Sequence, residues 1–84
     1  MALGKQVRTA EQLRAMVQVR MDELPEVRRR VADGRAAPLV GLPARVSQDH
    51  LGRNWDMPAP QHSFGLLASF REIVDILRDG YDLA

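Results

Sequence analysis

The sequence of 84 residues contains no cysteine, so neither a disulfide nor a cysteine-based metal site can stabilise it. A chain without cysteine fits the reducing cytoplasm, where we expect this protein. No apolar run approaches the roughly 20 residues that a membrane span needs. The first eight residues also lack the apolar core of a signal peptide. We therefore expect no membrane contact.

Recognisable catalytic motifs are also missing: there is no glycine-rich phosphate loop, no nucleophile elbow and no paired catalytic carboxylate motif. The two histidines, His50 and His62, lie in predicted loops. With Asp49 and Asp56 they offer ligands for a zinc ion or groups for acid–base chemistry, but they are not closely spaced. We expect no enzyme and no cofactor, and keep a small metal-binding or hydrolytic protein as the third hypothesis.

What is present is the composition of an ordinary small globular domain, with 45% apolar residues and a formal net charge of +1. This amount of apolar material supports one core. We expect a flexible N-terminal tail over residues 1–8 and a single α+β domain over residues 9–84.

Two helices are predicted in the first half of the chain. Thr9 and Gln12 have the spacing of a capping box, and the helical apolar stripe that follows consists of Leu13, Met16, Val17, Met21 and Leu24. Pro25 should end this helix and begin a shorter one, because proline is favoured at the first helical position. In that second helix Val27 and Val31 share a face, and Gly34 should close it.

The middle of the chain predicts a β-hairpin. Val40, Leu42, Ala44 and Val46 alternate, which indicates a strand with one buried face within residues 36–46, and Pro43 makes it an edge or irregular strand. Residues 47–52 read as the connection and residues 53–57 as the second strand. Trp55, the only tryptophan, should be central to the core.

The last helix is predicted from an apolar face of Leu66, Phe70, Ile73, Val74 and Leu77. Ser63 is the candidate N-cap and Gly80 the residue that follows the helix, so that Tyr81 or Leu83 could fold back onto it. The expected order is helix, strand, strand, helix: an α+β fold in which two helices cover one face of a two-stranded antiparallel hairpin.

The stretch Gly52-Arg53-Asn54-Trp55-Asp56 resembles a Gly-x-Asn-Trp-Asp motif in short bacterial proteins that also have an apolar C-terminal helix and a Tyr-x-Leu tail, here Tyr81-Asp82-Leu83. The resemblance implies no activity. It extends over residues 9–84.

The principal hypothesis is a small non-catalytic protein–protein interaction or accessory module. The unpaired hairpin edge at residues 39–46 can accept a partner strand, including one from a second copy of the chain. Asn54 and Asp56 project from one strand face, or instead bond within the hairpin or cap a helix. The candidate partner-contact residues are Arg45, Arg53, Asn54 and Asp56.

The alternative hypothesis is nucleic-acid binding through the only charge cluster, which consists of Arg28, Arg29, Arg30 and Arg35. Successive helix positions point in different directions, so three arginines in a row do not form one flat patch. The charge is also divided along the chain: residues 1–35 carry +3 and residues 36–84 carry −2. An acidic half would repel nucleic acid, and this division favours a protein partner.

Overall fold

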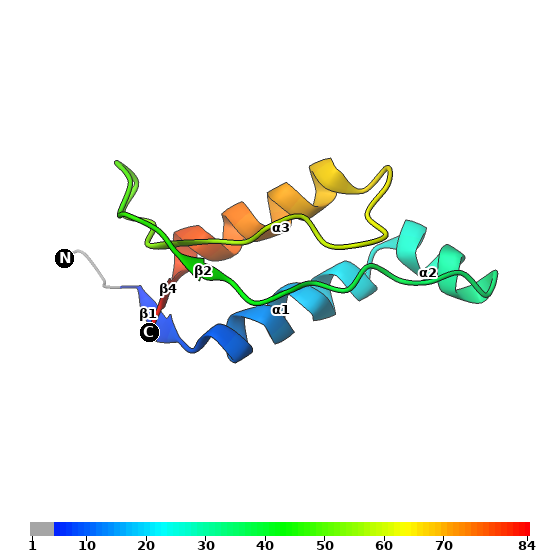
Figure 1. The fold of residues 1–84 in the computed structure, drawn as a ribbon, viewed down its shortest axis with the longest axis horizontal. Helices are drawn as coiled ribbons and strands as arrows, with labels where there is room; N and C mark the ends of the chain where they lie inside the picture. Colours follow the sequence, from blue (N-terminus) through cyan, green and yellow to red (C-terminus); the bar gives the residue numbers. More distant parts are fainter. Residues whose placement is uncertain (1–4) are drawn as a thin grey trace.

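The structure is a computed structural model that describes residues 5–84, and it contains two pairs of short strands and three helices. Figure 1 shows an elongated molecule, with principal extents of 47 × 23 × 21 Å. In chain order the elements are β1 (Gln6–Arg8), α1 (Ala10–Asp22), α2 (Pro25–Ala32), β2 (Ala44–Arg45), β3 (Trp55–Asp56), α3 (Leu67–Gly80) and β4 (Tyr81–Leu83). The predicted α+β class is confirmed.

Helix α1 begins as its sequence predicts. Thr9 accepts a hydrogen bond from the backbone N–H of Gln12, and the Gln12 side chain accepts one from the backbone N–H of Thr9, which completes the capping box. The predicted stripe provides the buried face of the helix, where Leu13, Val17 and Met21 are fully buried.

Helix α2 begins with Pro25 at its first turn and ends before Gly34, which has a positive φ of +77°, as predicted. Its two valines share a face but not an environment, because Val27 is buried and Val31 is 54% exposed. Figure 1 places α2 at one end of the molecule, so the outer part of this helix has no element beyond it to pack against.

The hairpin forms, but with much shorter strands than expected. Ala44 pairs with Asp56 and Arg45 with Trp55 in an antiparallel register, and Leu39 and Gln61 form an isolated bridge further along. The predicted buried face of the first strand is wrong. Only Val40 of its four members is buried, while Leu42, Ala44 and Val46 are exposed.

The reason lies in the prolines of the two hairpin segments. Pro38, Pro43 and Pro60 are buried, and none of them can donate a ladder hydrogen bond. Between the Ala44–Asp56 pair and the Leu39–Gln61 bridge, the two segments are therefore not joined by a continuous ladder of hydrogen bonds. Without this ladder, buried and exposed residues do not alternate strictly.

Helix α3 provides the other wall of the core. Phe70, Val74 and Leu77 are buried together with Trp55, which is 0% exposed and central to the core as predicted. The helix begins later than expected, since its N-cap is Leu66 and not Ser63. The Ser63 carbonyl instead accepts from the N–H of Leu66 in the preceding turn. Figure 1 shows α1 and α3 side by side, with the hairpin segments running along both.

The N-terminal prediction needs a correction. Residues 6–8, expected in a flexible tail, form β1, which pairs in parallel with β4; Val7 lies opposite Asp82 and Arg8 opposite Leu83. The chain leaves α3 at Gly80 and becomes extended at once as β4. Leu83 belongs to the same core cluster as Leu77 of α3, and Tyr81 packs against this cluster. Residues 1–4, also assigned to the tail, lie outside the described residues.

Candidate functional site

The predicted partner-contact residue Asn54 lies beside β4. Its side-chain oxygen accepts from the Leu83 N–H at 2.9 Å, and its Nδ2 donates to the Leu83 carbonyl at 3.1 Å. Trp55 donates from its indole N–H to the Tyr81 carbonyl at 2.9 Å. Strand β4 is therefore paired by β1 on one edge and by two side chains of the Asn-Trp-Asp motif on the other.

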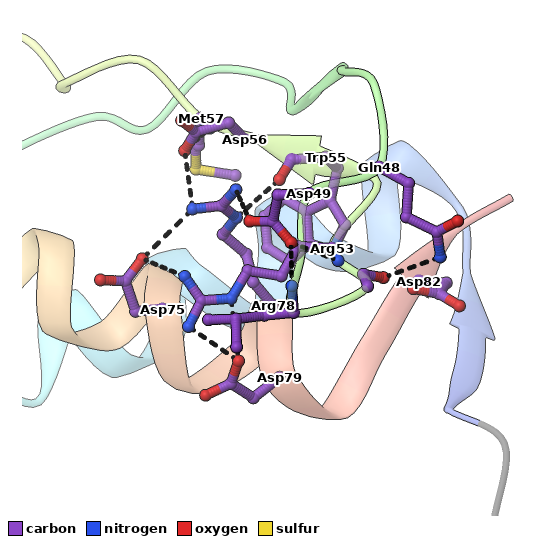
Figure 2. A network of polar contacts seen from close by, with 12 residues as sticks. Gln48, Asp49, Arg53, Trp55, Asp56, Met57, Asp75, Arg78, Asp79 and Asp82 are labelled. Atoms are coloured by element: carbon purple, nitrogen blue, oxygen red, sulfur yellow. Dashed lines mark hydrogen bonds and ion pairs between the residues drawn. The ribbon is translucent and has the colours of Figure 1, made fainter.

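Arg78, which sequence reasoning did not select, is the centre of the largest charged cluster. It is only 8% exposed, and its Nε donates to the Trp55 carbonyl at 2.7 Å. Its terminal nitrogens lie 3.4 Å from Asp75, 3.8 Å from Asp49 and 3.9 Å from Asp56. Figure 2 shows these groups arranged around the guanidinium. We call Arg53, Arg71, Arg78, Asp49, Asp56, Asp75 and Asp79 the arginine–aspartate cluster.

Two further arginines flank the centre of this cluster. Arg53 pairs with Asp79 at 2.8 Å and lies 3.7 Å from Asp75. Arg71 pairs with Asp56 at 3.0 Å and also lies 3.7 Å from Asp75. Asp75 is thus shared by three guanidiniums, which ties the loop before β3 to the last turns of α3.

The hydrogen bonds of the cluster favour the charged forms of its members. The N–H of Arg53 bonds to Asp49 and holds the pKa of that carboxyl below its usual value. Burial raises the pKa of Asp56, but the N–H of Met57 and the guanidinium of Arg71 outweigh it, so the net shift is downward. The hydrogen bond to Asp79 raises the pKa of Arg53.

A second contact closes the same end of the molecule. The Lys5 Nζ donates to the Gly52 carbonyl and to the Arg78 carbonyl, both at 3.0 Å, and lies 3.6 Å from Asp82. The nearer oxygen of Asp82, Oδ1, is buried and accepts no hydrogen bond, so its compensation is the charge of Lys5. No motif in the sequence marks this contact, because its partners are 47 to 77 positions away from Lys5.

The four predicted partner-contact residues therefore all bond within the chain. Arg45 donates to the carbonyls of Leu83 and Ala84, at 3.4 and 2.5 Å. The alternative interpretation, in which Asn54 and Asp56 bond within the hairpin or cap a helix, describes only one of these contacts, the Met57 N–H that donates to Asp56. Asn54 bonds instead to Leu83 of β4, and Asp56 to Arg71 of α3. The predicted free edge is also partly occupied, since the Gln18 amide donates to the Pro38 carbonyl and accepts from the Val40 N–H.

The two histidines lie on separate loops, and both are exposed. Within residues 5–84 no three His, Asp or Glu side chains form a group that could hold a metal ion. Neither imidazole ring makes a hydrogen bond to another described residue. His62 is instead notable for its backbone, because it is the one non-glycine residue of this range with a positive φ, +62°.

The four arginines of the nucleic-acid hypothesis lie on and after α2, at the end of the molecule opposite the arginine–aspartate cluster. Arg28, Arg29 and Arg35 are exposed. Arg30 is half-buried because it donates to the His62 carbonyl at 3.0 Å and to the Phe64 carbonyl. In contrast to the arginine–aspartate cluster, none of the four forms an ion pair with a carboxylate of the described chain.

Phe64 is the functional candidate that sequence reasoning missed. It is 92% exposed, more than any other large apolar side chain among the described residues. A hollow of about 220 Å³ lies beside it and is lined by Arg30, Arg35, Ala36, His62 and Phe64. The sequence contains no signal for this arrangement, because a phenylalanine followed by a glycine is equally compatible with a core residue at the start of a helix and with an exposed loop residue.

Comparison with known proteins gives no relative: no protein-family model, no curated protein and no solved structure matches the chain. In the part of the chain that the structure describes, no helix has the length and apolar character needed to cross a membrane.

Proposed function

We propose that this chain is a small, non-catalytic protein–protein interaction module whose contact surface includes Phe64. The observation that supports the proposal is an aromatic side chain, 92% exposed, on a loop that the fold holds in place. Aromatic side chains are enriched among the residues that dominate protein interfaces, because they bury a large area at a small cost in conformational entropy. A cytoplasmic location and a relation to the short bacterial proteins with the Gly-x-Asn-Trp-Asp motif are part of the same proposal.

The loop that presents Phe64 is fixed at several points. Arg30 bonds the carbonyls on both sides of Ser63, and the N–H of Leu66 bonds the Ser63 carbonyl at 2.8 Å. His62 adopts a left-handed backbone conformation that a residue with a side chain rarely takes. A loop ordered in this way loses less conformational entropy on binding.

Other apolar side chains lie near Phe64 along the chain or across the hairpin. Leu67, in the first turn of α3, is 52% exposed. Leu39 is 66% exposed and lies opposite Gln61 in the isolated bridge. Gln61 itself precedes Phe64 by three residues. We include Leu39 and Leu67 with Phe64 in the proposed contact surface, because large exposed apolar patches mark interaction sites.

The non-catalytic part of the proposal is supported by the state of the reactive groups. The carboxylates of the arginine–aspartate cluster all face guanidiniums, and the pKa values of Asp49 and Asp56 are lowered, which disfavours a role as proton donor near neutral pH. His50 and His62 are exposed and have no partner that would orient their rings.

Nucleic-acid binding remains a second candidate, because Arg28, Arg29 and Arg35 are exposed and carry charges without a carboxylate partner. The same end of the molecule also carries Glu26 and Asp33, which are exposed and would repel a polyanion. Binding that weakens steeply with rising salt concentration for any oligonucleotide sequence would favour this second function.

The test compares what the chain captures from its native cell extract when one exposed side chain is removed. Phe64→Ala should lose the proteins that the unchanged chain retains, whereas Leu51→Ala should retain them. Leu51 is the matched control because it is 53% exposed and lies in the turn between β2 and β3, beside the arginine–aspartate cluster. Identical proteins captured by the chain and by Phe64→Ala would exclude Phe64 as a contact. Sedimentation of both variants shows whether a second copy is the partner.

A further inference from the structure

The hollow beside Phe64 combines an aromatic surface with positive charge. Two arginines, Arg30 and Arg35, line it together with His62 and with Phe64, whose side chain is 92% exposed. Its volume of about 220 Å³ suits one or two side chains of a ligand and is too small to enclose a larger molecule.

Among residues 5–84, no carboxylate forms an ion pair with the arginines of this hollow. Arg53, Arg71 and Arg78 each pair with at least one aspartate, whereas neither Arg30 nor Arg35 forms an ion pair with a carboxylate of the described residues. Arg30 uses two of its donors on loop carbonyls, which satisfies hydrogen bonds but leaves its charge uncompensated. A ligand with a carboxylate would supply the missing charge and bond to Arg35.

The hollow is held in shape by contacts within the chain. Arg30 bonds to the loop carbonyls of His62 and Phe64, His62 has a φ of +62°, and the Phe64 side chain lies outside the core. Gly65 follows with a φ of +77° and lies close enough to Arg30 that a Cβ would be 3.6 Å from its guanidinium. Backbone strain of this kind is retained where surrounding contacts hold it in place, and it is often found at functional sites.

We propose that this hollow binds an acidic segment of a partner protein. A carboxylate of the segment bonds to Arg35 next to the positive charge of Arg30, and an apolar side chain of the same segment packs on Phe64. This proposal rests on the proposed function, because it specifies the chemistry of the partner that contacts Phe64.

An acidic peptide fits better than a nucleic acid for two reasons. The exposed carboxylates of Glu26 and Asp33, in the first turn and at the C-cap of α2, lower the positive potential that a long polyanion would meet along this helix. In addition, a strand of nucleic acid requires successive aromatic platforms or a basic groove that follows its backbone. The hollow offers one aromatic ring and one charged pair.

The test is an NMR titration of the ¹⁵N-labelled full chain with three probes in parallel. The probes are a synthetic peptide Glu-Asp-Leu-Glu-Asp, its basic counterpart Lys-Lys-Leu-Lys-Lys, and single-stranded oligothymidylate. We expect the acidic peptide to shift the amide signals of residues 30–36 and 61–66, with weaker binding at higher salt concentration. Absence of these shifts at millimolar acidic peptide, or equal shifts with the basic peptide, overturns the proposal. Stronger binding of the oligothymidylate overturns it in favour of nucleic acid.

Two substitutions complete the test. Arg35→Gln should weaken binding of the acidic peptide about tenfold, because a charge-assisted hydrogen bond is lost. Arg14→Gln, an exposed arginine of α1, should leave it unchanged. If Arg35→Gln still captures the cellular partner that Phe64→Ala loses, the acidic chemistry is wrong and the proposed function stands. If Phe64→Ala also captures everything, the proposed function itself fails.

Discussion

The Nε of Arg78 donates a 2.7 Å hydrogen bond to the backbone carbonyl of Trp55 and so connects the last turns of α3 to strand β3. The remaining nitrogens of the same guanidinium lie among the carboxylates of Asp49, Asp56 and Asp75. A buried charge is tolerated only when it is paired and hydrogen-bonded, and Arg78 meets both conditions. The arginine–aspartate cluster therefore primarily stabilises the packing of the hairpin against α3.

Replacement of Arg78 by leucine should lower the free energy of unfolding by about 3 kcal/mol, because the Trp55 carbonyl and the carboxylates around it lose their partner. The free energy of unfolding of Arg78→Lys should lie between those of the unchanged chain and Arg78→Leu, since lysine keeps the charge without the fixed geometry of a guanidinium. Urea unfolding of both variants measures this. Arg14→Leu, exposed on α1, is the control and should change stability by less than about 0.5 kcal/mol. Equal effects of Arg78→Leu and Arg14→Leu would contradict the role of the cluster.

The helices were predictable because their signals are local. The capping box of Thr9 and Gln12, Pro25 at the start of α2 and the apolar face of α3 each lie within a few residues of the structure they specify. Trp55 was predictable as a core residue for a different reason: a small core has few large side chains to fill it.

Strand β1 and the polar contacts of the site were not predictable, because their partners are distant in the sequence. Strand β1 has three residues and pairs with residues about 75 positions away, so neither length nor alternation marks it. The alternation of Val40 to Val46 was misleading, since the prolines among these segments break the ladder on which the alternation rule depends. The loop that carries Phe64 is bonded to Arg30, 32 to 34 positions away, so no local pattern marks the exposed position of Phe64.

Asn54 should matter to β4 more than to any partner. Asn54→Ala removes both hydrogen bonds to Leu83 and should cost about 1–2 kcal/mol, with faster hydrogen exchange of the Leu83 amide. Asn54→Asp keeps an acceptor for the Leu83 N–H but loses the donor to its carbonyl, so exchange of this amide should be slower than in Asn54→Ala. Unchanged exchange in Asn54→Ala would show that the side chain does not hold the strand edge.

Lys5 and Asp82 should depend on each other. Lys5→Met leaves a buried carboxylate oxygen without its charge partner, and we expect a loss of about 1–2 kcal/mol. Asp82→Asn should be less costly, and the double variant should be more stable than the sum of the two losses predicts. A double-mutant cycle from urea unfolding gives the coupling energy. A coupling near zero would mean that the contact is only a surface ion pair.

Acid should loosen the arginine–aspartate cluster. The pKa values of Asp49 and Asp56 are lower in the folded chain than their ordinary value of 3.8. As the pH falls through this range, the unfolded chain therefore takes up protons at these groups before the folded chain does. Their stabilising contribution is therefore present above pH 3.8 and is lost as the pH falls from 3.8 through the lowered values. Asp56→Asn should show a shallower decrease of stability over this range, measured by thermal unfolding at successive pH values. An equally steep decrease would assign the effect to other carboxylates.

The hydrogen bonds of Arg30 should determine whether Phe64 is presented in a fixed position. Arg30→Met removes the donors to the His62 and Phe64 carbonyls but keeps an unbranched side chain of helical preference in α2. Amide order parameters over residues 62–65 should fall from about 0.85, typical of rigid backbone, to below about 0.6. Because an ordered contact loses less entropy on binding, the same variant should lose captured partners although Phe64 is intact. Order parameters that are already low in the unchanged chain would refute the fixed presentation of Phe64, whatever the capture experiment gives.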